Sequence, residues 1–386
     1  MARGDPGSTW TEAAEVGYFA GLGVLGSTGF LFAPLVVGWL VTARGQTAAM
    51  GGWVVGLELA GAVAGAVRVS LVSGSPSRKM IAWLSGLITM ANLASIWTVS
   101  PAAFTVLRAL SGVGEGMALG VAYAGLAATR SAERNFAILL VLSLLLGSAG
   151  LYLLPWLGAV GIPWLYGAVA LTGALFLLIS QRRREPAPDR VAAADETQSC
   201  GGVSVWLALL AVFGLFTAQG AVWAFAERIA SGMGIGESAI GMALALSNFA
   251  GLAGASFAGS LGLRWGRLLP IASGGLGSAA LLAVFADAHS AVTFGAVICA
   301  LQLLWCWTIP YLMGALAQGV PGRAMMATGV VAQLAGLALG PVMSAALLER
   351  GAALATILTA CVALSLVSTA SGVLCTRMLR PRPCPQ

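Results

Sequence analysis

The stretch NFAILLVLSLLLGSAGLYLLPWLGAVGIPWLYGAVALTGALFLLISQ, residues 135–181, decides the fold, because it carries no charged side chain. A helix needs about 20 apolar residues to cross the hydrocarbon core of a bilayer, so this stretch is too long for one crossing and long enough for two. Pro155, Gly158 and the sequence Gly161-Ile162-Pro163 mark the turn between them, since glycine and proline interrupt helices. The stretch therefore predicts a hairpin of two membrane-spanning helices.

The same apolar pattern extends over the whole chain of 386 residues, which is 59% hydrophobic and 9% charged. Soluble domains are about 45–50% apolar and about 25% charged, so this composition excludes a cytosolic enzyme, a disordered chain and a nucleic-acid-binding domain. The long apolar runs also differ from the short alternating strands of a membrane β-barrel. We predict an all-α polytopic membrane protein whose twelve transmembrane helices lie near 17–42, 49–70, 80–99, 102–127, 136–157, 162–181, 203–227, 238–262, 268–288, 291–316, 323–347 and 352–376.

One long polar segment divides these spans into two sets of six. The segment QRRREPAPDRVAAADETQSCGG, residues 181–202, holds four arginines, four acids and two prolines. Its composition is typical of a flexible linker, although a plain solvated loop would have the same composition. We predict an N-terminal six-helix bundle at 1–181, a cytoplasmic linker at 182–202 and a C-terminal six-helix bundle at 203–386.

The basic residues indicate which side of the membrane each loop faces. Twelve spans place most of the 20 basic residues on the same side as the N-terminus, while Arg44, Arg228 and Arg350 fall on the opposite side. Cytoplasmic loops carry the excess of lysine and arginine in membrane proteins. The sequence therefore predicts that both termini lie in the cytoplasm, with the helices in the inner or plasma membrane.

Two short motifs resemble signatures of the major facilitator superfamily. The turn after the eighth span runs from Gly259 to Arg267 as GSLGLRWGR, which resembles the loop pattern G-x-L-a-D-R-x-G-R through Gly259, Arg264, Gly266 and Arg267; Leu263 stands where the family usually has aspartate. The fourth span reads RALSGVGEG from Arg108 to Gly116, which resembles the pattern R-x-x-x-G-x-G. The antiporter-associated pattern G-x-x-x-G-P is absent from the fifth span, but a similar string, GLALGP, occupies Gly336–Pro341 of the eleventh.

The resemblance implies a twelve-helix permease whose two six-helix halves are related by an axis along the membrane normal. In such transporters the substrate site lies between the halves near the membrane midplane. The resemblance also implies a small-molecule substrate and says nothing of which one.

Three ionisable residues fall inside predicted spans. Glu58 and Glu115 lie near the middle of the second and fourth spans, and Arg108 precedes Glu115 by seven residues, which places both on one face of the helix. A charge inside the membrane is costly, so such residues are functional candidates by default. One reading makes either acid a proton-binding carboxylate with Arg108 as its charge partner. The other makes them a structural ion pair that locks helix packing.

Polar and amphipathic side chains of the second half are candidates for lining a cavity. Gln219, Trp223 and Glu227 follow one another at intervals of four on the seventh span and so share a stripe. Glu227 with Arg228 reads as an interfacial pair at a helix end. The substrate-cavity candidates are Gln219, Trp223, Asn248, Trp307, Tyr311 and Gln333, and Gln302 is a further polar group of the second half.

The sequence favours a secondary transporter over an enzyme. No HExxH or GxSxG motif is present and the six cysteines form no CxxC pair, so we expect no metal, no cofactor and no catalytic centre. Few intramembrane charges predict a largely apolar cavity, which suits proton-coupled efflux of a small hydrophobic or amphipathic molecule by a monomer. The alternatives are symport or facilitated uptake of a metabolite, and a signalling or assembly protein that does not transport.

Overall fold

The computed structural model describes residues 12–71, 77–129, 131–182, 202–285, 290–317 and 322–378, and these residues form helices and short turns without a strand. Most of the predicted linker, residues 183–201, lies outside the described residues. The predicted all-α class is confirmed for the described part of the chain. Within it, nine segments are long and apolar enough to span a membrane, and one of these, Arg134–Gln181, is 48 residues long and covers two helices.

The first half of the chain folds into the helices that the spans predict, with one exception. They are α1 (Glu12–Gly26), α2 (Thr28–Leu31), α3 (Ala33–Thr42), α4 (Ala48–Ser70), α5 (Arg78–Trp97), α6 (Pro101–Ala127), α7 (Ala132–Leu153), the 3-10 helix η1 (Leu154–Val160) and α8 (Gly161–Arg182). Thr47, Ser77 and Ser100 cap α4, α5 and α6, each accepting a backbone N–H in the first turn of its helix.

The exception is the first predicted span, 17–42, which the structure breaks into α1, α2 and α3. The breaks fall at Ser27 and Phe32, and Pro34 lies in the first turn of α3, where proline is tolerated. A broken helix leaves backbone N–H and C=O groups free to bond elsewhere. The predicted hairpin at 136–181 is confirmed, with its turn formed by η1 and a positive φ of 53° at Gly158.

The second half forms six long helices, one for each predicted span. They are α9 (Val203–Gly232), α10 (Glu237–Leu261), α11 (Leu268–Phe285), α12 (Ala291–Ala317), α13 (Gly322–Glu349) and α14 (Leu354–Met378). Pro310 and Pro341 lie inside α12 and α13.

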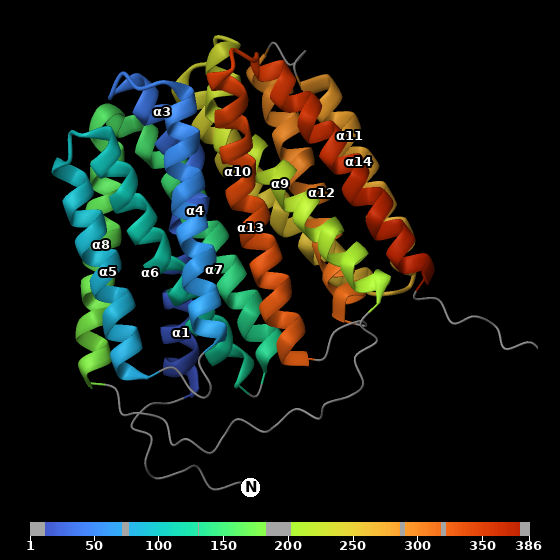
Figure 1. Ribbon diagram of the computed structural model, residues 1–386, viewed down its shortest axis with the longest axis horizontal. Coiled ribbons are helices and arrows are strands. Elements are labelled where there is room, and N and C mark those ends of the chain that lie inside the picture. The colour runs from blue at the N-terminus through green and yellow to red at the C-terminus, as the bar shows by residue number, and fades with distance from the viewer. Residues whose placement is uncertain are drawn as a thin grey trace, which may run out of the picture.

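The two halves stand side by side with their helices roughly parallel to one axis (Figure 1). We call the end where α8 finishes and α9 begins the linker end, which is at the bottom of Figure 1, and the opposite end the far end. The halves meet along two seams, α4 against α13 and α7 against α10, and α3 packs on α9.

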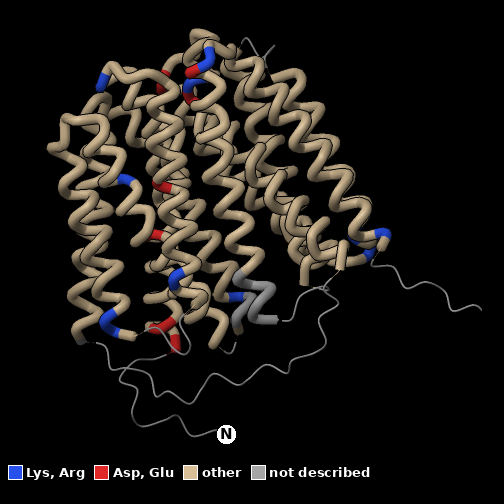
Figure 2. The backbone as a smooth tube through the Cα atoms, viewed as in Figure 1, with Lys and Arg blue, Asp and Glu red and all other residues tan. Residues whose placement is uncertain are grey.

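Charged residues gather at the two ends of the bundle, with few between them (Figure 2). This distribution is the one expected when the middle of each helix lies in hydrocarbon. The buried charged residues of the described chain are Glu58, Arg108, Glu115 and Glu227. Glu227 bonds its neighbour Arg228 near the far end of α9, so the other three are the charges of the bundle interior.

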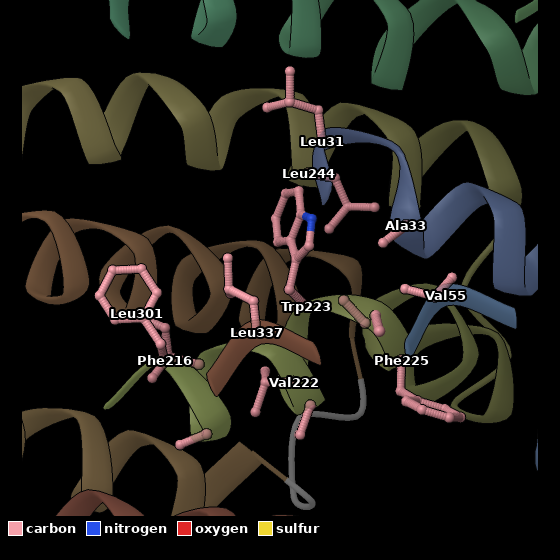
Figure 3. Close-up of a cluster of buried hydrophobic side chains, with 14 of the residues drawn as sticks. Leu31, Ala33, Val55, Phe216, Val222, Trp223, Phe225, Leu244, Leu301 and Leu337 are labelled. Carbon is pink, nitrogen blue, oxygen red and sulfur yellow. The ribbon is translucent and has the colours of Figure 1, made fainter. Parts of the chain in front are cut away.

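A hydrophobic core joins the halves around Trp223, whose side chain is 1% exposed. Leu31, Ala33 and Val55 from the first half enter this core, and Figure 3 shows the Trp223 indole pointing toward Leu31 and Leu244. The turn α2 therefore reaches across the seam into the second half.

Candidate functional site

The three interior charges form one cluster in the first half. The Arg108 guanidinium Nη1 lies 3.3 Å from Glu58 Oε1, and its Nη2 donates to Asn92 Oδ1 at 3.1 Å. Arg108 is 1% exposed, and Glu58 and Glu115 are each 3% exposed. The pair thus joins α4 to α6, and Asn92 adds α5, in a place from which water is excluded.

Glycines bring the backbones of α4 and α6 close enough for this cluster to form. A Cβ added at Gly112 of α6 would overlap the carbonyl oxygen of Glu58, and one at Gly116 would overlap that of Ala62. Small residues let membrane helices approach in this way. The glycines of the fourth-span motif therefore set the distance between the helix that carries Glu58 and the helix that carries Arg108 and Glu115.

A chain of hydrogen bonds connects Arg108 to Glu115 through neutral side chains. Asn92 Nδ2 donates to Ser111 Oγ at 2.8 Å, and Ser111 Oγ donates to Glu115 Oε1 at 2.8 Å. Because Asn92 Oδ1 also accepts from Arg108, the chain runs unbroken from the guanidinium to the second carboxylate. Networks in which every member is bonded hold buried polar groups at low cost.

The aromatic ring of Tyr166 covers the remaining side of Arg108. The guanidinium carbon lies 4.3 Å from the ring centroid, close enough for a cation–π interaction. Arg108 Nε has no hydrogen-bond partner among the described residues. The α8 ring therefore closes the cluster on the side away from the second half.

The break in the first helix closes the cluster on the opposite side. The backbone N–H of Gly29 donates to Glu115 Oε2 at 3.1 Å. A Cβ on Gly29 would lie 2.6 Å from that oxygen and 3.0 Å from Glu58 Oε1, so both carboxylates approach the same point of α2. The free N–H of a broken helix thus serves as the second donor to Glu115.

The next residue of the same turn bonds the other half of the molecule. Trp223 Nε1 of α9 donates to the Phe30 carbonyl oxygen at 2.8 Å, and the Phe30 ring lies 6.0 Å from the rings of both Trp223 and Trp305. Gly29 and Phe30 are adjacent, so α2 is bonded on one side to the buried acid and on the other to the C-terminal half.

The structure places four of the predicted cavity residues in three separate surroundings, with Trp307 and Tyr311 sharing one. Trp307 Nε1 donates to Ser273 Oγ at 3.3 Å and its ring stacks on Phe257 at 5.1 Å, so it faces α10 and α11. Tyr311 lies beside it, with its hydroxyl 3.4 Å from the Ala258 carbonyl oxygen. Gln333 Nε2 lies 3.0 Å from Met313 Sδ, and Trp223 belongs to the core described above.

Gln219 and Asn248 belong to a different group, on the surface of the second half that faces α2. Gln219 Nε2 donates to Gln302 Oε1 at 2.8 Å. A Cβ at Gly147 of α7 would lie 3.1 Å from Asn248 Nδ2 and 3.2 Å from Leu31 Cδ2, which places Asn248 at the seam between the halves. The roles proposed for these residues stay predictions.

The motif turn at the linker end joins α10 to α11. Gly262 and Gly266 adopt positive φ of 54° and 65°, which glycine alone takes without strain, so the second glycine of the loop pattern is required by the backbone. Gly259 lies in the last turn of α10 with open space beside it, and Arg267 lies against Gly314 of α12. Arg264 sits in the exposed turn itself.

Several residues of the charged cluster were absent from the sequence prediction. Ser111 stands four residues before Glu115, a helical spacing that puts both on one face, and this signal was available. Asn92, Tyr166 and Gly29 come from other helices, and their approach depends on packing that no local pattern encodes.

A cavity of about 570 Å³ opens at the linker end between α4, α9 and α13. It is lined by Ser70, Trp206, Leu209, Leu210, Phe213, Thr328, Val331 and Ala332. At the far end the halves touch, since Trp53 Nε1 donates to Glu349 Oε1 at 2.8 Å and Gly38 packs against Glu227. Glu58 and Glu115 do not line the cavity and are covered by α2.

Within the described residues no cluster of three or more histidine, cysteine, aspartate or glutamate side chains has the arrangement of a metal site. Four cysteines of that part, at positions 299, 306, 361 and 375, are free thiols.

Comparison with known proteins identifies the fold. No family model and no curated protein sequence matches the chain. Among solved structures, the inward-open xylose transporter XylE from E. coli has a TM-score of 0.73 and 14% identity, covering 96% of this chain and 95% of that one. The nucleoside transporter NupG has a TM-score of 0.75 and 10% identity, covering 96% and 100%.

A bacterial homologue of the human lysosomal transporter Spinster, in an inward-facing and unoccupied conformation, has a TM-score of 0.68 and 14% identity over 96% of this chain and 98% of that one. These similarities extend over nearly the full length of both partners, so they concern the arrangement of all the helices. Together with the apolar helices they support an integral membrane protein. The chain therefore has the fold of major facilitator permeases, as its motifs and its two sets of six helices predicted.

Proposed function

We propose that the protein is a secondary transporter that exports a small hydrophobic or amphipathic molecule in exchange for protons by alternating access. Both termini and the linker end face the cytoplasm, the membrane is the inner or plasma membrane, and the protein works as a monomer. The structural neighbours named above are transporters, which supports this function over that of an enzyme.

One observation carries the proton-coupling part of the proposal. The turn α2 donates to the buried carboxylate of Glu115 through Gly29 and accepts from Trp223 of the second half through Phe30. An ionised carboxylate is a stronger acceptor than a protonated one, so protonation of Glu115 weakens the bond that holds α2 on the first half. The same turn is part of the seam, so its movement changes the contact between the halves.

The proposal also requires a proton path that this conformation closes. Glu58 and Glu115 lie under α2, and the cavity at the linker end does not reach them. A shift of α2 opens the cluster to the seam and so makes proton access dependent on the relative position of the halves. This dependence is what coupling needs, because an acid accessible from both sides at once would leak protons.

The alternative within the same class is proton symport. One structural neighbour, with a TM-score of 0.71 and 14% identity, is a D-xylose–proton symporter. Its fold covers 94% of this chain, and the buried cluster serves symport as well as exchange. The direction of proton movement relative to substrate separates the two.

The test is a proteoliposome assay with a pH-sensitive dye in the lumen. D-xylose, uridine and 4-phenylbutanamide are added in turn, and their radiolabelled flux is measured with and without an imposed pH gradient. We expect gradient-driven flux that Glu115→Gln abolishes and Glu58→Gln reduces strongly, while Glu237→Gln, an exposed acid at the far end, leaves it unchanged.

Exchange predicts that substrate moving one way drives protons the other way, and symport predicts movement in the same direction. A flux insensitive to the gradient would contradict coupling. If Glu115→Gln and Glu58→Gln both fold and neither changes the flux of any probe, the protein is not a coupled transporter.

A further inference from the structure

The surface of the second half that faces α2 carries a group of uncharged polar side chains, which we call the amide face: Gln219, Asn248, Gln302 and Trp305. They come from three helices, α9, α10 and α12. All are buried or half-buried, and Asn248 is 1% exposed. Buried polar groups in native proteins are nearly always hydrogen-bonded, so a buried group without a partner needs an explanation.

Contacts connect the members of the amide face into one site. Asn248 and Gly251 lie one turn apart on α10, and a Cβ at Gly251 would be 3.0 Å from Gln302 Cγ. Gln302 and Trp305 lie one turn apart on α12, and Trp305 faces Phe30 at 6.0 Å. The residue after Phe30, Leu31, lies against the same glycine of α7, Gly147, as Asn248 does. The contacts therefore form a closed ring that begins and ends at Asn248.

Two N–H donors in this site have no acceptor in the described part of the chain. They are Asn248 Nδ2 and Trp305 Nε1, both shielded from solvent. A buried donor without a partner is destabilising, and native proteins rarely keep one without a purpose. In the charged cluster of the first half Asn92 and Ser111 are fully engaged, and the unpartnered atoms there, Arg108 Nε and Tyr166 Oη, lie against each other's side chains. Two empty donors within one group of connected side chains point to an acceptor that arrives from outside the chain.

The site offers no charge to a ligand. No ionisable side chain belongs to the amide face, and the nearest charges along α9, Glu227 and Arg228, bond each other at 2.6 Å two turns farther toward the far end. An ion buried here would lack a counter-charge, which is costly. The site therefore selects against anions and cations and leaves neutral acceptors as its ligands.

Aromatic rings pack against Trp305 of the amide face. Phe216 meets Trp305 at 5.2 Å, edge to face, and the Phe30 ring lies 6.0 Å from the same indole. Phe216 is one helical turn from Phe213, which lines the cavity at the linker end. The lining of that cavity is apolar apart from Ser70 and Thr328.

We propose that the amide face binds an uncharged molecule with hydrogen-bond-accepting oxygens and an apolar or aromatic portion, and that Asn248 Nδ2 and Trp305 Nε1 donate to those oxygens. This inference rests on the proposed transport function and names the substrate class of its site. The neutral ligand explains both the empty donors and the absence of charge around them.

The test uses four probes of matched size: 4-phenylbutanamide, 4-phenylbutanoate, 4-phenylbutylamine and butylbenzene. Binding to the full-length protein in lipid nanodiscs is measured by equilibrium dialysis with radiolabelled probes, and the unspecific partition into lipid is subtracted with empty nanodiscs. We expect saturable binding of the amide only.

Asn248→Leu and Trp305→Phe should each weaken amide binding about three- to tenfold, the effect of one lost hydrogen bond. Trp83→Phe, an exposed indole on α5 that lines neither the cavity nor the amide face, serves as the matched control and should leave the affinity within about twofold. Two variants on different helices keep the test decisive if one fails to fold.

Tighter binding of the carboxylate or the amine, equal binding of butylbenzene, unchanged amide affinity in both variants, or no saturable binding of any probe would overturn the proposal. Binding does not require proton movement, so the test is separate from that of transport. Saturable amide binding without proton-coupled flux would support the amide face as a binding site and refute proton coupling. Proton-coupled flux of a charged substrate would support coupling and refute a site for neutral ligands.

Discussion

The two halves of the molecule share a fold but differ in what they bury. The first half encloses Glu58, Arg108 and Glu115 in a network whose neutral members, Asn92 and Ser111, are fully bonded. The second half encloses amides and indoles, two of which have unfilled donors. The turn α2 lies between the two groups and touches both.

This difference separates two tasks that a coupled transporter must perform. A bonded cluster of charges keeps its geometry without a ligand and can hold or release a proton. A site with empty donors is completed by a ligand. We infer that the halves divide these tasks, and each of the following substitutions tests one side of that division.

The largest effect is expected for Arg108→Leu, which leaves Glu58 buried without its cation. Removing one partner of a buried ion pair costs about 3–5 kcal/mol of the free energy of unfolding. Thermal unfolding of the purified protein in nanodiscs measures it, with Arg78→Leu at the exposed start of α5 as the control. The double variant Arg108→Leu with Glu58→Gln should recover part of the loss, and a single variant as stable as the parent would contradict a structural pair.

A smaller loss is expected when the α4–α6 contact is pushed apart. Gly112→Ala places a methyl group against the Glu58 carbonyl, and overpacking of this kind costs about 1–3 kcal/mol. Gly86→Ala on α5 has open space around its Cβ and should cause no loss. The same thermal unfolding compares them, and equal stabilities would show that close approach of these helices is not needed.

The comparison of the halves is tested most sharply by one substitution made in each. Asn92→Leu strands Ser111 and Arg108, so we expect a loss of about 1–3 kcal/mol. Asn248→Leu removes a donor that has no partner, so unfolding without ligand should occur at the same or a higher temperature. Two losses of equal size would mean that both asparagines are structural.

The smallest effects are expected at the two tryptophan hydrogen bonds across the seam. Trp223→Phe removes a buried bond to Phe30 and should cost about 0.5–1.5 kcal/mol, whereas Trp53→Phe removes an exposed bond to Glu349 and should cost less. Unfolding temperatures of the two variants rank them, and a larger loss at Trp53 would place the main contact of the halves at the far end.

The sequence predicts the helices well because each apolar run must cross a bilayer of fixed thickness. Spans such as 49–70 and 102–127 agree closely with α4 and α6. The break of the first span at Ser27 and Phe32 was not predicted, since the residues there, Gly26-Ser27-Thr28-Gly29, weaken a helix without specifying where it stops.

The candidate site was predicted in part. Glu58, Arg108 and Glu115 were found because charge in an apolar run is conspicuous, and the structure brings all three together. Their neutral partners come from other helices and leave no local pattern. For Trp307 and Tyr311, composition could not tell a ring that faces α10 and α11 from one that faces the seam, because both environments are apolar.

The central claim is that Glu115, through α2, links proton binding to the relative position of the halves. Pulsed electron paramagnetic resonance measures it most directly, with spin labels on Lys79→Cys and Leu263→Cys, both exposed at the linker end, after replacement of the native cysteines. We expect a long distance between the two labels, from molecules whose halves are apart at the linker end, to dominate at alkaline pH, where an ionised Glu115 holds Gly29. The population with this long distance should fall at acid pH.

Glu115→Gln should make the distance distribution independent of pH, and Glu237→Gln should leave the response of the parent intact. A parent protein whose distribution is the same at acid and alkaline pH, or a Glu115→Gln variant that still responds, would contradict the account.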